Sequence, residues 1–133
     1  PKRTSRGLEA NRLQLLLAVL EKRCGVFSRT SDVYLNITGG LTLRDPAADL
    51  AVCVSLASTL KDIPLPSDVC FIGEVGLAGE VRPAGRTMMR LKEASRLGFK
   101  KAVISRRSPK DEYPMETVRV SSLNDALGLF LKG

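Results

Sequence analysis

Hydrophobic residues recur at helical spacing in four segments of the chain. Leu13, Leu16, Leu17 and Leu20 follow the i, i+3, i+4, i+7 pattern of an amphipathic helix, which Gly25 ends. Each of the other three segments has either apolar residues at helical spacing or a nearly all-apolar run. Each is also bounded by a capping or stop signal. The predicted helices cover residues 8–23, residues 47–60 after the capping pair Asp45-Pro46, residues 86–97 before Gly98, and the segment from Leu123 to Phe130 after the cap Ser122.

Shorter apolar runs between these helices predict strands. Val33, Leu35 and Ile37 alternate with polar or aromatic residues, and three further runs are short and apolar. The predicted strands cover residues 33–37, 69–72, 102–104 and 118–120, and the glycine-punctuated segment 73–81 predicts a hairpin or a tight double turn. The order α-β-α-β-β-α-β-β-α, without repeats or a low-complexity linker, predicts one mixed α/β or α+β domain over residues 1–133.

Composition removes several kinds of chemistry. The chain has no histidine, which excludes Ser-His-Asp and Cys-His catalysis and histidine zinc sites. It has no phosphate-binding loop of the G-x-x-x-x-G-K-[ST] type and no apolar run long enough to cross a membrane. Cys24, Cys53 and Cys70 lack CxxC spacing, so we expect buried free thiols in a reducing compartment.

The net charge of +7 is unevenly distributed. Residues 1–30 carry seven basic and two acidic groups, residues 31–80 two and seven, residues 81–110 ten and one, and residues 111–133 two and four. Basic blocks of this kind attract phosphate backbones, and aromatic residues amount to only 5%, which argues against stacking on single strands. A solvated basic face remains the alternative.

One acidic residue is unusual for its position. Asp45 is explained as a helix cap, but Asp49 follows it by one turn inside an apolar helix. We expect either a buried partner such as an arginine or a contact in an oligomer.

Several of these segments resemble one family. The strings DPAADLAV (45–52) and IGEVGLAGEVRP (72–83) carry most of the likeness, and residues 7–13, 18–23, 90–94 and 97–99 add to it. They resemble the C-terminal domain of the bacterial-type RadA (Sms) recombination and repair ATPases, which is itself similar to the proteolytic domain of Lon. The resemblance implies a Lon-like fold of the ribosomal protein S5 domain 2-like class. It also implies a C-terminal portion of a larger ATPase, whose upstream domains, and not this one, would bind ATP, magnesium and zinc.

In Lon-type proteases a serine within a Pro-Ser-Ala-Gly motif is the nucleophile, and a lysine on a later helix takes its proton. Carried over by this motif, the serine position holds Ala47 and the lysine position holds Met88. The resemblance therefore implies a protease fold without its catalytic pair. The alternative of an active Ser-Lys peptidase would need Lys92 with Ser55 or Ser58, which lie too far along the helix. An RNA-binding α/β module is a further alternative.

The resemblance also implies a hexameric ring and a role in homologous recombination and branch migration, with DNA and a recombinase as partners. We expect DNA contacts from one basic cluster: Lys2, Arg3, Lys22, Arg23, Arg29 and Lys61. We expect subunit contacts from Arg82, Arg86 and Arg90, paired across the ring with acidic residues that include Asp45 and Asp49. Lys100, Lys101, Arg106 and Arg107 are interpreted as solvated surface. The expected location is the bacterial cytoplasm and its nucleoid, or a plastid or mitochondrion, with no membrane partner.

Overall fold

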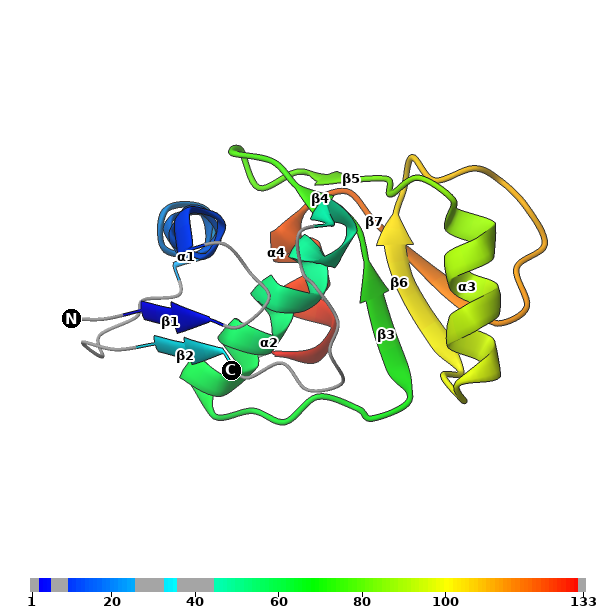
Figure 1. Ribbon diagram of the computed structural model, residues 1–133, viewed down its shortest axis with the longest axis horizontal. Coiled ribbons are helices and arrows are strands. Elements are labelled where there is room, and N and C mark those ends of the chain that lie inside the picture. The colour runs from blue at the N-terminus through cyan, green and yellow to red at the C-terminus, as the bar shows by residue number, and fades with distance from the viewer. Residues whose placement is uncertain (1–2, 6–9, 26–32, 36–44, 132–133) are drawn as a thin grey trace.

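The computed structural model describes residues 3–5, 10–25, 33–35 and 45–131 (Figure 1). Within these ranges the helices are α1 (Ala10–Cys24), the short 3-10 helix η1 (Pro46–Ala48), α2 (Asp49–Lys61), α3 (Thr87–Arg96) and α4 (Leu123–Phe130). The strands are β1 (Arg3–Ser5), β2 (Val33–Leu35), β3 (Val69–Ile72), β4 (Glu74–Val75), β5 (Val81–Arg82), β6 (Lys101–Ser105) and β7 (Glu116–Val120).

A three-stranded parallel sheet is the centre of the described structure. Its strand order is β3-β6-β7, so β6 lies in the middle and is buried on both faces. Because successive side chains of a strand point to opposite faces, the sheet separates two clusters of apolar residues. Phe71 and Val103 join the larger cluster with α1, α2 and α4, whereas Ala102 and Ile104 pack with Leu91 of α3. The sheet is therefore the middle of three layers (Figure 1).

Two small sheets complete the fold. β1 and β2 pair in parallel, and β4 and β5 form an antiparallel hairpin in which Glu74 faces Arg82 and Val75 faces Val81. The hairpin follows β3 directly, so it extends the chain from the edge of the main sheet towards α1 and α2 (Figure 1).

The predicted mixed α/β class is confirmed, and the four predicted helices and the hairpin are found. Residues 8–9 and 36–37, at the ends of two predicted elements, lie outside the described residues. β1 was not predicted, because the three residues Arg3–Ser5 show no alternation of polar and apolar positions. No helix within the described parts of the chain is long and apolar enough to cross a membrane.

The expectation of buried thiols is correct for one cysteine of three. All three are free, but Cys24 and Cys70 are only half-buried. Cys53 is fully buried in α2, and burial raises the pKa of its thiol far above the ordinary value. A thiol that stays protonated is a packing residue and not a nucleophile.

Candidate functional site

The start of α2 is the place where a Lon-type protease would carry its nucleophile, and here it is fixed by backbone contacts. Asp45 caps η1 by accepting a hydrogen bond at Oδ1 from the Ala47 N–H at 3.0 Å, and Pro46 occupies the first turn. Gly73 donates to the Ala47 carbonyl and accepts from the Leu50 N–H, both at 3.0 Å. The turn is thus held against the junction of β3 and β4, with Ala47 buried.

Gly73 is required for the close approach of β5 to the end of β3. A Cβ atom at residue 73 would lie 3.0 Å from Val81 Cγ1 and 3.3 Å from the Arg82 carbonyl oxygen, both of which belong to β5. A larger residue would therefore crowd the second strand of the hairpin.

A hollow of about 1060 Å³ lies between Asp45 and α3. Met88 is half-buried in its wall and Met89 is 61% exposed. The described residues that line it are Asp45, Arg86, Met88, Met89, Arg90, Lys92, Glu93 and Arg96. None of these described side chains is a serine, threonine or cysteine, so the described lining offers cations, two carboxylates and thioethers, and no hydroxyl or thiol nucleophile.

Asp45 also links η1 to α3, because it accepts a hydrogen bond from Arg90 of α3. The Arg90 guanidinium donates to Asp45 Oδ2 at 2.9 Å and to the Gly85 carbonyl at 2.7 Å. The hydrogen bond from the Ala47 N–H, followed by the bond from Arg90, lowers the pKa of Asp45. The carboxylate therefore acts as a structural link between η1 and α3 and not as a proton donor at neutral pH.

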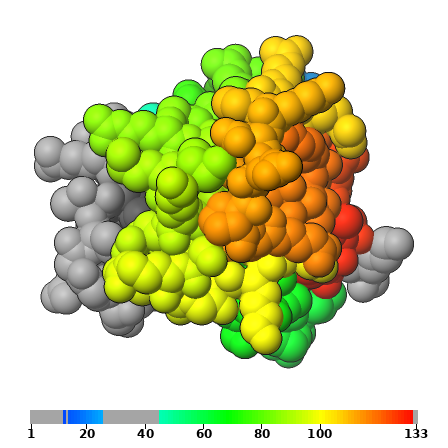
Figure 2. All heavy atoms as spheres, turned by 90° about the vertical axis from the view of Figure 1, so that its right-hand side faces the viewer, coloured from blue at the N-terminus to red at the C-terminus, as the bar shows by residue number. Residues whose placement is uncertain are grey.

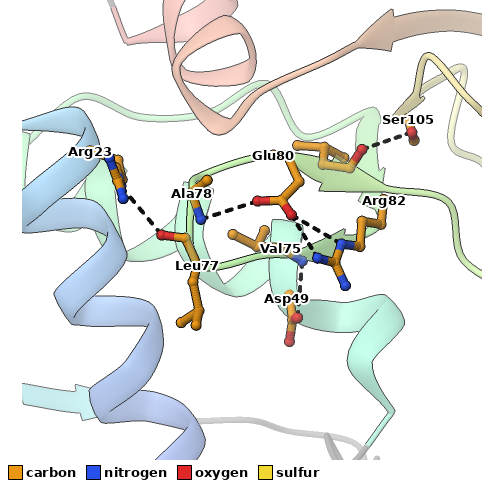
Figure 3. Close-up of polar contacts among 9 residues, drawn as sticks. Arg23, Asp49, Val75, Leu77, Ala78, Glu80, Arg82 and Ser105 are labelled. Carbon is orange, nitrogen blue, oxygen red and sulfur yellow. Dashed lines mark hydrogen bonds and ion pairs between the residues drawn. The ribbon is translucent and has the colours of Figure 1, made fainter.

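The hairpin beside α2 is docked on four sides, and Figure 3 shows the contacts on three of them. Its Val75 N–H donates to Asp49 Oδ2 at 3.1 Å, its Leu77 carbonyl accepts from Arg23 Nε at 3.3 Å, and its Val81 carbonyl accepts from the buried Ser105 hydroxyl at 2.9 Å. On the fourth side, the N–H of Leu123 at the start of α4 donates to the Gly79 carbonyl at 2.7 Å. These contacts connect α1, α2, β6 and α4 through one short turn.

Glu80 organises the turn itself. Its carboxylate accepts from the Ala78 N–H at 3.1 Å and from Arg82 at 2.7 and 3.2 Å (Figure 3). The Arg82 hydrogen bonds lower the pKa of Glu80. Because Cβ at residue 76 would lie within 2.4 Å of the Glu80 carboxylate atoms, Gly76 leaves the space that this carboxylate fills.

These contacts change the predicted subunit interface. Arg82 and Arg90 pair with Glu80 and Asp45 inside the same chain, so they do not need acidic partners across a ring. Asp49 is only 3% exposed and pairs with Arg12 of α1, which leaves it no surface to offer a second subunit. The interface prediction is wrong for Asp49, whereas the alternative expectation of an arginine partner is confirmed by Arg12, which is itself only half-buried.

Arg86 is the third arginine of the predicted subunit interface. It is exposed, it precedes α3 in a left-handed backbone conformation with φ of 59°, and it has no acidic partner within 4 Å among the described residues. Its interface role stays a prediction.

The cluster predicted to bind DNA is described only in part. Lys2 and Arg29 lie outside the described residues, and Arg3 is placed in β1 without a described side chain. Lys22 and Arg23 occupy the last turn of α1, and Lys61 is the last residue of α2. The positive charge of Lys61 opposes the rise that burial causes in the pKa of Cys24, so the ends of α1 and α2 lie near each other.

The alternative catalytic pair is not assembled in the structure. Lys92 lines the hollow, but Ser58 donates its hydroxyl hydrogen to the Ile63 carbonyl at the opposite end of α2. Ser55 is exposed and lies six residues into α2, roughly 9 Å along its axis from Asp49. Neither serine lines the hollow in which Lys92 lies.

Two arginines that position this region were not identified from the sequence. Arg12 neutralises Asp49, and Arg119 of β7 donates to the carbonyl groups of Ser108 and Pro109 at 2.6 and 3.0 Å. The single aspartate in an apolar helix indicated that Asp49 has a cationic partner, since a buried carboxylate needs a cation, but it did not indicate which residue. No local sequence pattern indicates the contacts of Arg119, because its partners lie in the loop before its own strand.

Comparison with known proteins agrees with this geometry. The family model of the Lon protease (S16) C-terminal proteolytic domain matches residues 18–124. The chain is 44% identical over 127 residues to DNA repair protein RadA of Aquifex aeolicus (strain VF5), covering 96% of this chain and 29% of the relative. It is 50% identical over 104 residues to that of Bacillus subtilis (strain 168), covering 78% and 23%, and 41% identical over 132 residues to that of Escherichia coli (strain K12), covering 98% and 29%.

The chain thus spans less than a third of the length of these curated relatives. The match to the family model includes η1 with its cap Asp45, the hairpin, and α3, and of these Asp45 and α3 line the hollow. The chain belongs to the Lon protease (S16) C-terminal proteolytic domain family, in the form that RadA repair proteins carry.

Proposed function

We propose that this chain is a non-proteolytic, Lon-like scaffold domain of a RadA-type DNA repair helicase, which binds DNA and supports assembly of a hexameric ring. The observation that carries the proposal is the chemistry of two positions, the methyl group of Ala47 and the thioether of Met88. Neither group can attack a peptide bond or accept a proton from a nucleophile.

The surroundings of these positions support the loss of peptidase activity. Ala47 is 7% exposed at the start of α2, and the described lining of the neighbouring hollow contains no hydroxyl group. The lysine in that lining, Lys92, would need a serine within hydrogen-bond reach, and both candidate serines lie further along α2.

Charge supports the binding of DNA. The chain carries a net charge of +7, and its 5% aromatic content favours contact with phosphates over stacking on bases. The relatives are named DNA repair proteins, which favours DNA as the polyanion. We place this function in the bacterial cytoplasm and nucleoid, or in an organelle of bacterial descent.

In this proposal the motor lies in the other parts of the longer protein. Those parts would bind ATP, magnesium and zinc and would act with a recombinase during branch migration. This domain would add an assembly surface and a surface for DNA.

Two assays on the purified chain test the proposal. In a competition assay, duplex DNA should displace a labelled duplex DNA probe more effectively than structured RNA does. With casein as substrate, no cleavage is expected, while an active Lon-type protease serves as positive control. Cleavage abolished by Ser55→Ala or Ser58→Ala would establish the peptidase alternative, and preferential displacement by RNA would establish the RNA-binding alternative.

A further inference from the structure

The positive charge of the chain is concentrated on one stretch of sequence. Residues 86–115 carry nine basic residues and three acidic residues, Glu93, Asp111 and Glu112, so their net charge of +6 is close to the +7 of the whole chain. We propose that the surface formed by α3 with its flanking residues (86–101) and by the β6–β7 loop (residues 106–115), here called the α3 face, is where this domain contacts the phosphate backbone of duplex DNA. The inference rests on the proposed DNA binding and assigns it to a surface other than the predicted cluster at the ends of α1 and α2.

The two parts of the α3 face lie on the same side of the main sheet. Leu91 of α3 packs with Ala102 and Ile104 of β6, and Tyr113 and Met115 of the loop pack against the same cluster. Figure 2 shows the helix and the loop next to each other on one side of the molecule. Basic side chains from both segments therefore project from one continuous surface.

Most cations of this face have no acidic partner. Arg90, Arg96 and Lys101 form ion pairs with Asp45, Glu93 and Glu116. Among the described residues, no carboxylate lies within 4 Å of the charged groups of Arg86, Lys92, Lys100, Arg106, Arg107 and Lys110, and all six residues are exposed. Unneutralised cations gathered on one surface are the arrangement that releases counterions from DNA on binding.

The loop that presents three of these cations is held in one conformation. β6 and β7 are parallel neighbours, and the segment between them contains no helix, although such connections are usually helical. In place of a helix, Arg119 supports this segment by donating to the carbonyl groups of Arg106, Ser108 and Pro109 at 3.3, 2.6 and 3.0 Å. The Tyr113 hydroxyl donates to the Pro109 carbonyl at 2.6 Å.

The Ser105 hydroxyl, which is fully buried, adds an acceptor for the Arg107 N–H at 3.1 Å. The backbone that carries Arg106, Arg107 and Lys110 is thus fixed before any ligand binds. A preorganised loop loses little conformational entropy on binding, which favours a binding role over a solvated surface.

The chemistry of the face favours backbone contact with a duplex. Phe99 and Tyr113 are the aromatic residues between 86 and 115, and both are half-buried. Exposed aromatic rings on which single-stranded bases could stack are therefore missing from this described segment. The α3 face offers point charges to phosphates without reading bases.

The end of α1 and α2 offers fewer free cations. The Arg23 guanidinium already donates to the Leu77 carbonyl, which leaves Lys22 and Lys61 as the exposed cations without an ion-pair partner among the described residues of that end. The α3 face presents six such cations on one surface.

A matched pair of double variants tests the assignment. Lys92→Glu with Arg107→Glu alters the α3 face, and Lys22→Glu with Lys61→Glu alters the other end by the same net charge. All four side chains are exposed and lack ion-pair partners among the described residues, so neither variant removes an ion pair from the fold. Binding of a random-sequence DNA duplex is measured by fluorescence anisotropy across a salt series, and thermal unfolding verifies that each variant is folded.

The α3 variant should bind roughly tenfold more weakly at low salt, and the slope of log K against log salt should fall by about 2, since each phosphate contact contributes about 0.9. The control variant should change Kd less than twofold. Equal weakening by both variants, or weakening by the control alone, would overturn the assignment to the α3 face. Wild-type protein that binds no duplex at low salt would instead overturn the proposed DNA binding itself.

Discussion

Arg12 of α1 and Asp49 at the start of α2 form an ion pair that joins two helices 37 residues apart in sequence. Asp49 is 3% exposed and also accepts from the Val75 N–H of the hairpin at 3.1 Å. One carboxylate therefore holds α1, α2 and the hairpin together, beside the position where a related protease would carry its nucleophile.

Removal of the cation should cost more than removal of the acid. Arg12→Met leaves a buried carboxylate without a counter-charge, and we expect the free energy of unfolding to fall by about 3 kcal/mol. Asp49→Asn keeps an acceptor for Val75, and Arg12, which is 29% exposed, can turn to water, so we expect a loss of about 1–2 kcal/mol. Urea unfolding of both variants measures the difference, and an equal or reversed order would contradict the account of this pair.

Asp45 should contribute to stability in a pH-dependent way. Its folded pKa is lowered, first by the Ala47 N–H and then by Arg90, so its contribution is complete above the ordinary aspartate pKa. As the pH falls through the lowered pKa, that contribution is lost. Asp45→Ala should cost about 1 kcal/mol at pH 7, because the helix cap is removed.

Asp45→Asn provides the control, because asparagine can still cap η1 but does not titrate. The difference in stability between wild type and Asp45→Asn should be present at pH 7 and should be lost as the pH falls below the ordinary aspartate pKa and through the lowered folded pKa. A difference that stays constant across this range would show that the charge of Asp45 does not stabilise the fold.

Arg86 carries a backbone conformation that suits glycine. Its φ of 59° is left-handed, a conformation that costs a side-chain-bearing residue about 1–2 kcal/mol. Arg86→Gly would remove this cost, but part of the gain is lost because glycine is more flexible in the unfolded chain. We therefore expect Arg86→Gly to stabilise the protein by about 0.5–1 kcal/mol. Arg86→Ala, which removes the same charge but keeps Cβ, should show no such gain; equal stabilisation by both variants would identify charge repulsion as the cause.

Arg119 should stabilise the β6–β7 loop locally. Loss of its hydrogen bonds to three loop carbonyls in Arg119→Met should increase amide hydrogen exchange at Arg107 and Ser108 several-fold while leaving α2 protected. Arg96→Met, which removes only an exposed pair with Glu93, serves as control. Unchanged exchange at both amides would mean that Arg119 does not hold the loop.

Local signals in the sequence were sufficient for most elements of this fold. Asp45 caps η1, Asp62 ends α2 in a left-handed conformation, and Ser122 accepts from the Asp125 N–H at 3.1 Å at the start of α4. Each of these is a contact within a few residues, so composition and spacing predict it. The order of strands in the sheet was not predicted, because pairing between β3 and β6 depends on contacts about 30 residues apart.

At the candidate site, too, the contacts between residues distant in sequence were the ones that could not be predicted. The sequence offered a cation as one of two explanations for Asp49, and this one is correct, but the sequence could not choose Arg12 among 21 basic residues. It placed the partners of Arg82 and Arg90 on another subunit, whereas the hairpin and the capping turn supply them within the chain. The support that Arg119 gives to the loop carrying Arg106 and Arg107 was not predicted, because it comes from a strand later in the chain.

Sedimentation velocity of the purified chain, with and without duplex DNA, tests the central claim that this Lon-like domain serves assembly and DNA binding instead of proteolysis. The account predicts species heavier than the 14.4 kDa monomer at micromolar concentration, and co-sedimentation with the duplex that is lost at high salt. A 14.4 kDa monomer that neither associates nor moves with DNA would contradict it.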